Sequence, residues 1–219
     1  MKSKALIAEF IGTFALVFIG VGAVAADAMT NGNLGLVGVA MAHGLTIAVM
    51  VSATAAVSGG HLNPAVTIGL WSAKKINGRN TLGYVIAQLL AGIVAVFALK
   101  LIIPASVLET IAMGAPTLGP GITPIAGLGT ELILTFFLVF VVYGTAVHHE
   151  APKVGGLFIG LTVALDILMG GPLTGAAMNP ARHLGPALLG GGLHDFWIYW
   201  LGPLVGGILA ARVYRDFLE

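Results

Sequence analysis

The chain has 219 residues, of which 58% are hydrophobic and 9% are charged, and its formal net charge is +1. A soluble domain averages roughly 25% charged residues, so this composition excludes an ordinary water-soluble globule, and the near-zero net charge provides no electrostatic surface for nucleic acid. The absence of cysteine excludes disulfides, thiol nucleophiles and thiolate metal sites.

Six apolar segments are long enough to cross a bilayer, because a spanning helix needs about 20 mainly apolar residues. The first follows a basic N-terminus that resembles a signal peptide, but the apolar run continues past Glu9 without a convincing cleavage site, so we expect a retained span. The expected spans cover residues 5–26, 34–57, 82–103, 129–147, 154–171 and 194–214. The sequence therefore predicts an integral, multi-pass, all-α membrane protein.

The basic residues predict how these spans are oriented. If consecutive spans alternate in direction, most of the basic residues fall on one side of the membrane: Lys2, Lys4, Lys74, Lys75, Arg79, Lys153, Arg212 and Arg215. Because Lys and Arg concentrate on the cytoplasmic side of membrane proteins, we expect both termini in the cytoplasm. We expect the host to be the cell membrane.

Two interruptions follow apolar spans. Residues 58–64 read Ser-Gly-Gly-His-Leu-Asn-Pro after the second span, and residues 170–175 read Gly-Gly-Pro-Leu-Thr-Gly after the fifth. Each pattern is typical of a full span followed by a short helix that re-enters the membrane. Irregular backbone at membrane depth persists only where it is buried in protein or faces water, so the sequence predicts a water-filled path.

The second half of the chain repeats the first. Residues 9–18 match residues 131–140 at most positions, and the segment 58–65 corresponds to 174–181. With three spans per half, the second copy enters the membrane from the opposite face, which makes an inverted repeat whose broken helices meet near the midplane. We therefore expect one channel domain over 1–219, with repeats at 1–103 and 129–219 and an extracellular connecting loop at 104–128.

Each interruption contains the tripeptide Asn-Pro-Ala. The two copies are Asn63, Pro64 and Ala65, and Asn179, Pro180 and Ala181. Asn is a preferred N-cap and Pro is favoured at the first helical position, so each copy begins a helix. One such tripeptide indicates only a capped helix, whereas two copies in register within an inverted repeat indicate a shared site.

The paired segments Ser58–Ala65 and Thr174–Arg182, with residues 8–10 and 199–203, closely resemble the aquaporins, the major intrinsic protein family. The resemblance covers essentially the whole chain. It implies six tilted membrane helices plus two re-entrant half-helices, commonly as a homotetramer with one pore per subunit. It also implies a passive channel that conducts water in single file and excludes protons and ions, with no catalytic residue, metal or cofactor.

The resemblance places both half-helix N-termini at the pore centre, where each is equivalent to about half a positive charge. A cation is repelled there, while water only reorients, and the amides of Asn63 and Asn179 can donate to water oxygens and oppose a continuous proton-conducting chain. The unwound carbonyls expected to accept hydrogen bonds along the path belong to Gly59, Gly60, His61, Leu62, Thr174, Gly175 and Ala177. The remaining wall is expected to be apolar.

By the same resemblance, the outer constriction consists of His43, Ile167, Ala176 and Arg182. A charge such as that of Arg182 costs at least about 2.5 kcal/mol at membrane depth and is functional by default. This set of four resembles plant tonoplast intrinsic proteins rather than orthodox water channels. Ile167 and Ala176 remove bulk and polarity from two walls, so we expect a wider filter, with ammonia and hydrogen peroxide as further candidate solutes.

Three acids are expected to support the pore. The resemblance suggests that Glu9 and Glu131 each satisfy unpaired amides of a re-entrant loop. Asp166 directly precedes Ile167, and two interpretations stay open for it. It is either a neutral or hydrogen-bonded acid of the helix bundle, or an acceptor for His43 or Arg182 that holds the filter in shape.

Two other functions remain as alternatives to the water channel. A glycerol facilitator usually has Asp after the second Asn-Pro-Ala-Arg, whereas His183 follows here, and the pair Tyr199-Trp200 is typical of water channels. A coupled secondary transporter, from a different functional class, also combines inverted repeats with broken helices. Asp166 is the only candidate for its ion site or proton relay.

Overall fold

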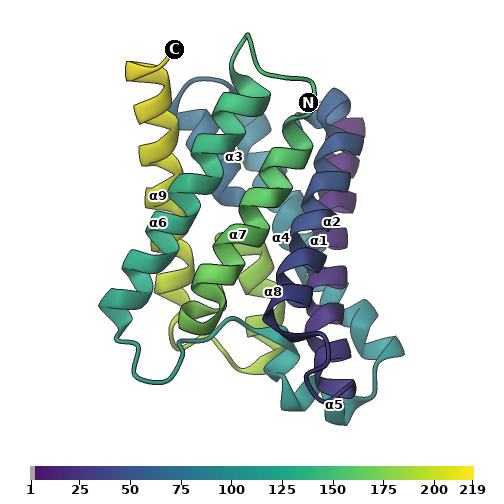
Figure 1. Ribbon diagram of the computed structural model, residues 1–219. Helices are drawn as coiled ribbons and strands as arrows, with labels where there is room; N and C mark the ends of the chain where they lie inside the picture. The colour runs from purple at the N-terminus through teal and green to yellow at the C-terminus, as the bar shows by residue number, and fades with distance from the viewer. Residues whose placement is uncertain (1–2) are drawn as a thin grey trace.

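The computed structural model describes residues 3–219, so Lys2, one of the residues used to predict the orientation, lies outside it. The elements are α1 (Ser3–Met29), α2 (Gly35–Ser58), α3 (Pro64–Ser72), α4 (Gly78–Ile102), α5 (Ala105–Thr110), the 3-10 turn η1 (Ala112–Gly114), α6 (Pro124–Val142), the π-helical turn η2 (Tyr143–Val147), α7 (Gly155–Thr174), α8 (Pro180–Gly190) and α9 (Phe196–Phe217). The long helices lie side by side in one bundle (Figure 1). The predicted all-α fold class is confirmed over these residues.

Six of the described helices are long and apolar enough to cross a membrane: α1, α2, α4, α6 with η2, α7 and α9. They coincide with the six predicted spans, with shifted ends. α6 begins at Pro124 rather than near residue 129, because Thr123 caps it by accepting a hydrogen bond from the Ala126 amide at 3.2 Å. α7 continues through Pro172 to Thr174 and stops where Gly175 adopts a φ of 78°, so the predicted break at 170–175 was placed too early.

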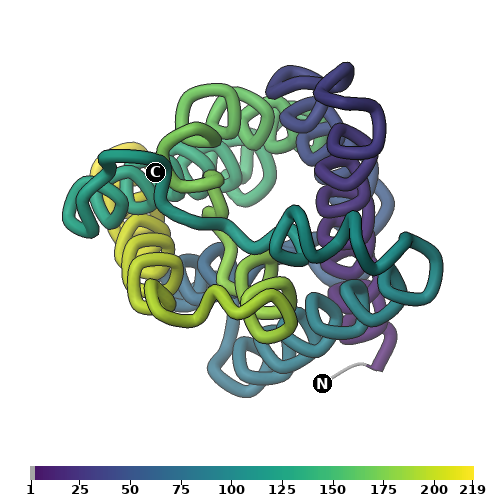
Figure 2. Tube along the Cα trace, turned by 90° about the horizontal axis from the view of Figure 1, so that it is seen from below, coloured from purple at the N-terminus to yellow at the C-terminus, as the bar shows by residue number. Residues whose placement is uncertain are grey.

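The connection at 104–128 is not a plain loop. It contains α5 and η1, and Figure 2 shows the rest of it crossing one end of the helix bundle. The connection at residues 104–128 therefore borders the mouth of any pore that opens at that end of the bundle.

The half-helices α3 and α8 pack on helices of the opposite half, α3 against α9 and α8 against α4. A glycine makes each contact possible. A Cβ added to Gly92 of α4 would collide with the carbonyl oxygen of Ala181, and one added to Gly207 of α9 would lie 2.8 Å from that of Ala65. Small residues permit such close backbone approach between membrane helices, so each Asn-Pro-Ala motif is held against the other repeat.

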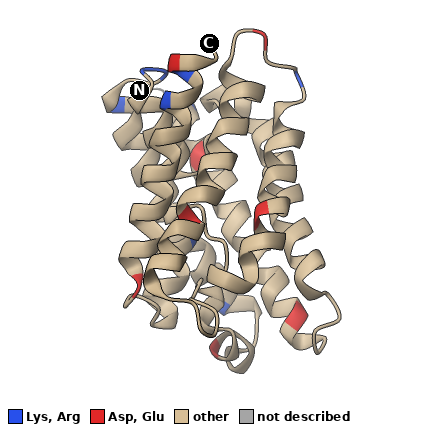
Figure 3. Ribbon diagram, turned by 60° about the vertical axis from the view of Figure 1, so that its left-hand side comes forward, with Lys and Arg blue, Asp and Glu red and all other residues tan. Residues whose placement is uncertain are grey.

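Charge is confined to the ends and a few interior positions of the bundle. Lys and Arg gather mainly at the end where the two chain termini lie (Figure 3). The outward faces are apolar, with side chains such as Leu82 (63% exposed), Leu101 (87%) and Ile125 (73%) uncovered. An apolar belt with basic residues at one end is the surface expected of a membrane-spanning bundle.

Candidate functional site

Both Asn-Pro-Ala motifs begin half-helices. Asn63 is the N-cap of α3, and its Oδ1 accepts a hydrogen bond from the Ala65 amide at 2.8 Å. Asn179 caps α8 in the same way, accepting from the amides of Ala181 at 2.9 Å and Arg182 at 3.2 Å. The side-chain oxygen of each asparagine thus accepts from amides of its own half-helix, which leaves the NH₂ group to bond to other parts of the chain.

The two asparagine NH₂ groups cross-link the halves of the chain. Asn63 Nδ2 donates to the Met178 carbonyl at 2.8 Å, and Asn179 Nδ2 donates to the Leu62 carbonyl at 3.1 Å. Each acceptor is the residue before the other asparagine. Both side chains are at most 4% exposed, and both line the same central cavity. Since each NH₂ has two hydrogens, one per asparagine remains for a molecule in that cavity.

The segments leading to the motifs hold several residues in the left-handed region. Leu62, Ala176 and Met178 have φ values of 51°, 45° and 50°, which costs a non-glycine residue roughly 1–2 kcal/mol. Such strained backbone persists only where the surroundings over-determine it. Two buried carboxylates provide that support.

Glu9 and Glu131 are fully buried and occupy equivalent places in the two halves. Glu9 accepts hydrogen bonds from the Ser58 hydroxyl at 2.6 Å and from the amides of His61 at 3.0 Å and Leu62 at 2.6 Å. Glu131 accepts from the hydroxyl of Thr174 at 2.7 Å, the amide of Ala177 at 2.9 Å and that of Met178 at 2.7 Å. The structure therefore places both acids where the sequence analysis expected them, on unpaired loop amides.

The side chains behind these carboxylates differ between the halves. Gln88 donates to Glu9 at 2.8 Å and to Thr67 at 3.0 Å, and Thr67 in turn lies 3.1 Å from His61 Nδ1. Four residues after the second asparagine, in the place of Thr67, stands His183. Its ring is fully buried and stacks on Tyr199 at a centroid distance of 4.6 Å. No side chain among residues 3–219 hydrogen-bonds to either ring nitrogen, and the nearby polar group is the Gly192 backbone.

The four residues of the expected outer constriction come together. Arg182 Nη1 donates to the Gly114 carbonyl of η1 at 2.7 Å, and its Nη2 lies 3.5 Å from His43 Nε2. His43 Nδ1 lies 2.9 Å from the Val39 carbonyl. Because a carbonyl can only accept, Nδ1 carries the hydrogen and Nε2 presents its lone pair to Arg182. Ile167 and Ala176 complete the lining and are 4% and 2% exposed.

A chain of three cavities runs through the molecule. The central one has a volume of about 30 Å³ and contains both asparagines and the filter residues. An outer cavity of about 430 Å³ meets it at His43, Ile167 and Arg182, and an inner one of about 260 Å³ meets it at Gly60, His61, Val142 and Ile159. Two wide vestibules are thus joined by a narrow passage with a neck at each end.

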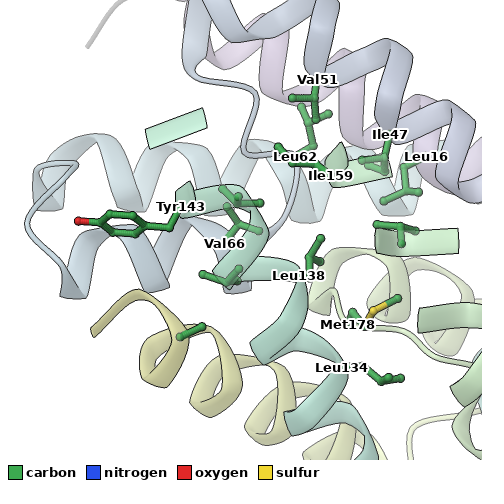
Figure 4. Close-up of a cluster of buried hydrophobic side chains, with 14 of the residues drawn as sticks. Leu16, Ile47, Val51, Leu62, Val66, Leu134, Leu138, Tyr143, Ile159 and Met178 are labelled. Atoms are coloured by element: carbon green, nitrogen blue, oxygen red, sulfur yellow. The ribbon is translucent and has the colours of Figure 1, made fainter. Parts of the chain in front are cut away.

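The wall of the central cavity is otherwise apolar. It belongs to the cluster of buried hydrophobic side chains in Figure 4, which includes Leu16, Ile47, Val51, Leu138, Ile159 and Met178. Water in this passage therefore finds polar partners only at the asparagines, the unwound carbonyls and the filter.

The structure corrects part of the predicted carbonyl set. Gly60, His61 and Ala177 line the central cavity, Gly59 the inner vestibule and Gly175 the outer one. Leu62 and Thr174 line none of these three cavities, because the Leu62 carbonyl accepts from Asn179 and the Thr174 carbonyl from Tyr199 at 2.9 Å. Both residues hold the loops rather than forming the path.

The prediction that Asp166 accepts from His43 or Arg182 was wrong. Those two side chains bond to Val39, to Gly114 and to each other. Asp166 is 6% exposed, its Oδ2 has no hydrogen-bond partner within residues 3–219, and it lines none of the three cavities. Asp166 is therefore a buried acid of the helix bundle.

Sequence reasoning missed two contributors. Gln88 donates a hydrogen bond to Glu9, and the Gly114 carbonyl accepts one from Arg182. Gln88 was visible as a lone polar residue in an apolar span. Nothing in the sequence marks Gly114, because it acts through its backbone carbonyl.

Comparison with known proteins gives a consistent result. The family model described as "Major intrinsic protein" matches residues 1–214. Aquaporin TIP4-4 of Zea mays is 44% identical over 96% of this chain and 85% of its own length, and Aquaporin TIP4-1 of Arabidopsis thaliana is 46% identical over 98% and 86%. The solved structure of the aquaglyceroporin from Plasmodium falciparum superposes with a TM-score of 0.85 at 26% identity, covering 98% of this chain and 96% of that one.

Proposed function

This chain belongs to the major intrinsic protein family, and we infer that it is a passive membrane channel for water. The observation that carries this inference is the reciprocal pairing of Asn63 and Asn179 inside a passage of about 30 Å³ between two open vestibules. One water molecule needs roughly 10–15 Å³ of such space, so a passage of about 30 Å³ holds only a few water molecules at a time. The TIP-type aquaporins at 44–46% identity support the same conclusion.

Exclusion of cations has two electrostatic sources. The N-termini of α3 and α8 each present about half a positive charge to the middle of the passage. Arg182 adds a full charge at the outer neck. At about 6 Å and an effective dielectric near 20, that charge raises the energy of a passing cation by about 3 kcal/mol, which is roughly a hundredfold effect.

Exclusion of protons follows from the orientation imposed on water. A water molecule between the asparagines accepts from one free hydrogen of each NH₂ group, so its own hydrogens point away from the centre towards both vestibules. A proton relay needs a continuous run of donors pointing one way, and the donor direction reverses here. The apolar wall offers no other route.

The filter also sets the range of neutral solutes. His43 accepts from Arg182, so the arginine is held to one side, while Ile167 and Ala176 offer small apolar walls. We propose that ammonia and hydrogen peroxide pass as well as water. Each is close to water in size and can bond to the same carbonyls.

Glycerol is the second candidate solute, because the solved relative is titled an aquaglyceroporin. Its 26% identity is well below that of the TIP-type aquaporins, and His183 stands where glycerol facilitators usually have Asp. A coupled carrier loses its one candidate ion site, since Asp166 faces none of the three cavities.

The chain is an integral multi-pass membrane protein with six spans. We propose that the basic end with both termini faces the cytoplasm. We also propose that four copies assemble in the membrane, each with its own pore, and that the apolar outer faces of the helices contact lipid. The cell membrane expected from the sequence lacks support, because TIP-type relatives are typically proteins of the vacuolar membrane.

Stopped-flow light scattering on proteoliposomes tests the function. We expect osmotic water flux well above that of empty vesicles, with a weak temperature dependence and no response to ion gradients, uptake of ammonia, and little uptake of glycerol. Water flux equal to that of empty vesicles would contradict the channel, and ammonia uptake no faster than in empty vesicles would reject that extension alone.

A further inference from the structure

An apolar groove of about 410 Å³ lies on the outer surface between α1 and α4. Leu6, Ile7 and Phe10 line it from α1, and Ile86, Ala87 and Leu90 line it from α4 together with Gly83. Ile7, Ile86 and Leu90 remain 58%, 49% and 52% exposed. None of these residues lines the pore or its vestibules, so the groove opens away from the channel.

Two basic residues stand at one end of this groove. Residues three or four apart share a helix face, and Lys4 precedes Ile7 by three positions while Arg79 precedes Gly83 by four. Both are exposed, and neither forms an ion pair with any residue in 3–219. Both helices begin at the end of the bundle where Lys and Arg gather (Figure 3).

No acid within the described residues offsets these charges. Glu9 is the acid nearest in sequence, but it is fully buried on the other face of α1, where Ser58, Leu62 and Gln88 occupy its oxygens. The surface groove therefore has an apolar floor and two positive charges at one end.

We propose that this groove binds an anionic phospholipid, with an acyl chain along the apolar floor and the phosphate between Lys4 and Arg79. From Gly83 to Leu90 the floor extends about 10 Å at 1.5 Å per residue, which fits within one leaflet of a hydrocarbon core about 30 Å thick. Basic clusters beside grooves between membrane helices on the cytoplasmic side are suited to anionic headgroups.

A second copy of the chain fits the groove less well than a lipid does. A two-fold contact through this face would bring Lys4 and Arg79 of both copies to the same end of the interface, because such a contact uses the same patch on both partners. Four like charges would then meet without a counter-charge.

Native mass spectrometry of the full protein, extracted from bilayers of equal phosphatidylglycerol and phosphatidylcholine with identical acyl chains, tests the proposal. We expect the wild type to retain phosphatidylglycerol selectively. Each basic residue near an anionic surface contributes about fivefold in affinity, so Lys4→Ala with Arg79→Ala should reduce the preference about 30-fold. Ala87→Phe should reduce retention of both lipids by filling the groove.

The matched control is Lys153→Ala with Arg212→Ala, which removes two charges at the same end of the bundle but away from the groove, and it should retain the wild-type preference. Three results would overturn the proposal. The first is a wild type that retains both lipids equally, and the second is an equal loss of phosphatidylglycerol preference in the control, which would indicate an effect of general surface charge. The third is a change of oligomeric state in Ala87→Phe without loss of lipid, which would assign the groove to a second copy.

Discussion

The two re-entrant segments have the same motif and nearly the same backbone, but different side chains hold them. The first depends on a complete polar network in which Glu9 accepts four hydrogen bonds, one of them from Gln88. The second depends on Glu131, which accepts three hydrogen bonds, and His183 behind it pairs with no other side chain. The comparison indicates that the carboxylate and the capping asparagine define the pore centre, whereas the layer behind them can vary.

The second re-entrant segment also contributes two of the four residues of the outer filter. Ala176 and Arg182 both belong to the second segment, and Arg182 depends on Gly114 from the connection between the repeats. The first segment is thus a fully bonded support, and the second combines support with selectivity.

Removing either carboxylate should have the largest effect. A buried polar group left without a partner costs about 1–3 kcal/mol. Glu131→Ala strands two amides and a hydroxyl, so we expect a loss of roughly 4 kcal/mol or more, and Glu9→Ala should lose more because it also strands Gln88. Thermal unfolding in detergent with water flux in parallel measures this. Wild-type melting of Glu9→Ala would show that the network is not a support.

Removing the filter charge should be the next largest effect. Arg182→Val eliminates the repulsion of about 3 kcal/mol at the outer neck. We expect cation entry, followed as uptake of radiolabelled sodium into proteoliposomes, to rise up to a hundredfold while water flux persists. Lys153→Ala is the control and should leave cation entry unchanged. Unchanged exclusion in the arginine variant would assign selectivity to the half-helices alone.

Substitutions of the residues packed behind the two carboxylates should change protein stability in opposite directions, with stabilisation at His183 and destabilisation at Thr67. His183→Phe keeps the ring stacked on Tyr199 and removes two buried ring nitrogens with which no side chain pairs, so we expect stabilisation by about 1 kcal/mol. Thr67→Val keeps the shape but deprives His61 and Gln88 of a partner, so we expect destabilisation by about 1–2 kcal/mol. Denaturation of both variants in detergent compares them, and the same sign in both would remove the distinction drawn between the halves.

The smallest effect concerns an exposed contact that joins the two halves. Lys75, after α3, donates to Glu219, after α9, at 2.6 Å. This hydrogen bond lowers the pKa of Glu219 below its ordinary value of 4.5 and raises the pKa of Lys75 above 10.5. The contact should be fully present between these values, and be lost as pH falls through the lowered pKa or rises through the raised one.

Hydrogen exchange at the end of α9 measures this dependence. We expect protection at neutral pH that decreases in acid in the wild type, and a Lys75→Met variant that is unprotected at both. A pH-independent exchange rate in the wild type, after correction for intrinsic exchange, would contradict the assignment.

Much of this organisation is readable from the sequence. Hydrophobic length predicts six spans, and the repeated Asn-Pro-Ala with its preceding glycines predicts two capped half-helices, because capping and proline chemistry are local. Glu9 and Glu131 could be placed through the resemblance to the aquaporins, which implies that each acid satisfies amides of a re-entrant loop. The ends of α6 and α7 were less predictable. The Thr123 cap moves the start of α6 to Pro124, and α7 continues through Pro172 to Thr174.

The rest depends on tertiary contacts that no local pattern encodes. The sequence left two interpretations of Asp166 open, because it could not show that His43 and Arg182 bond to backbone carbonyls and to each other. Leu62 and Thr174 lose their expected place in the path because Asn179 and Tyr199 approach from distant segments. Gly114 could not be found at all, since any residue type carries a backbone carbonyl.

The central claim is that paired asparagines at opposed helix tips pass water and stop protons. Proteoliposomes loaded with a pH-sensitive dye, exposed at once to an osmotic gradient and a pH gradient, measure both permeabilities in the same vesicles. The account predicts rapid shrinkage with a pH gradient that decays no faster than in empty vesicles. Collapse of the pH gradient together with the rapid shrinkage, or no rapid shrinkage, would contradict it.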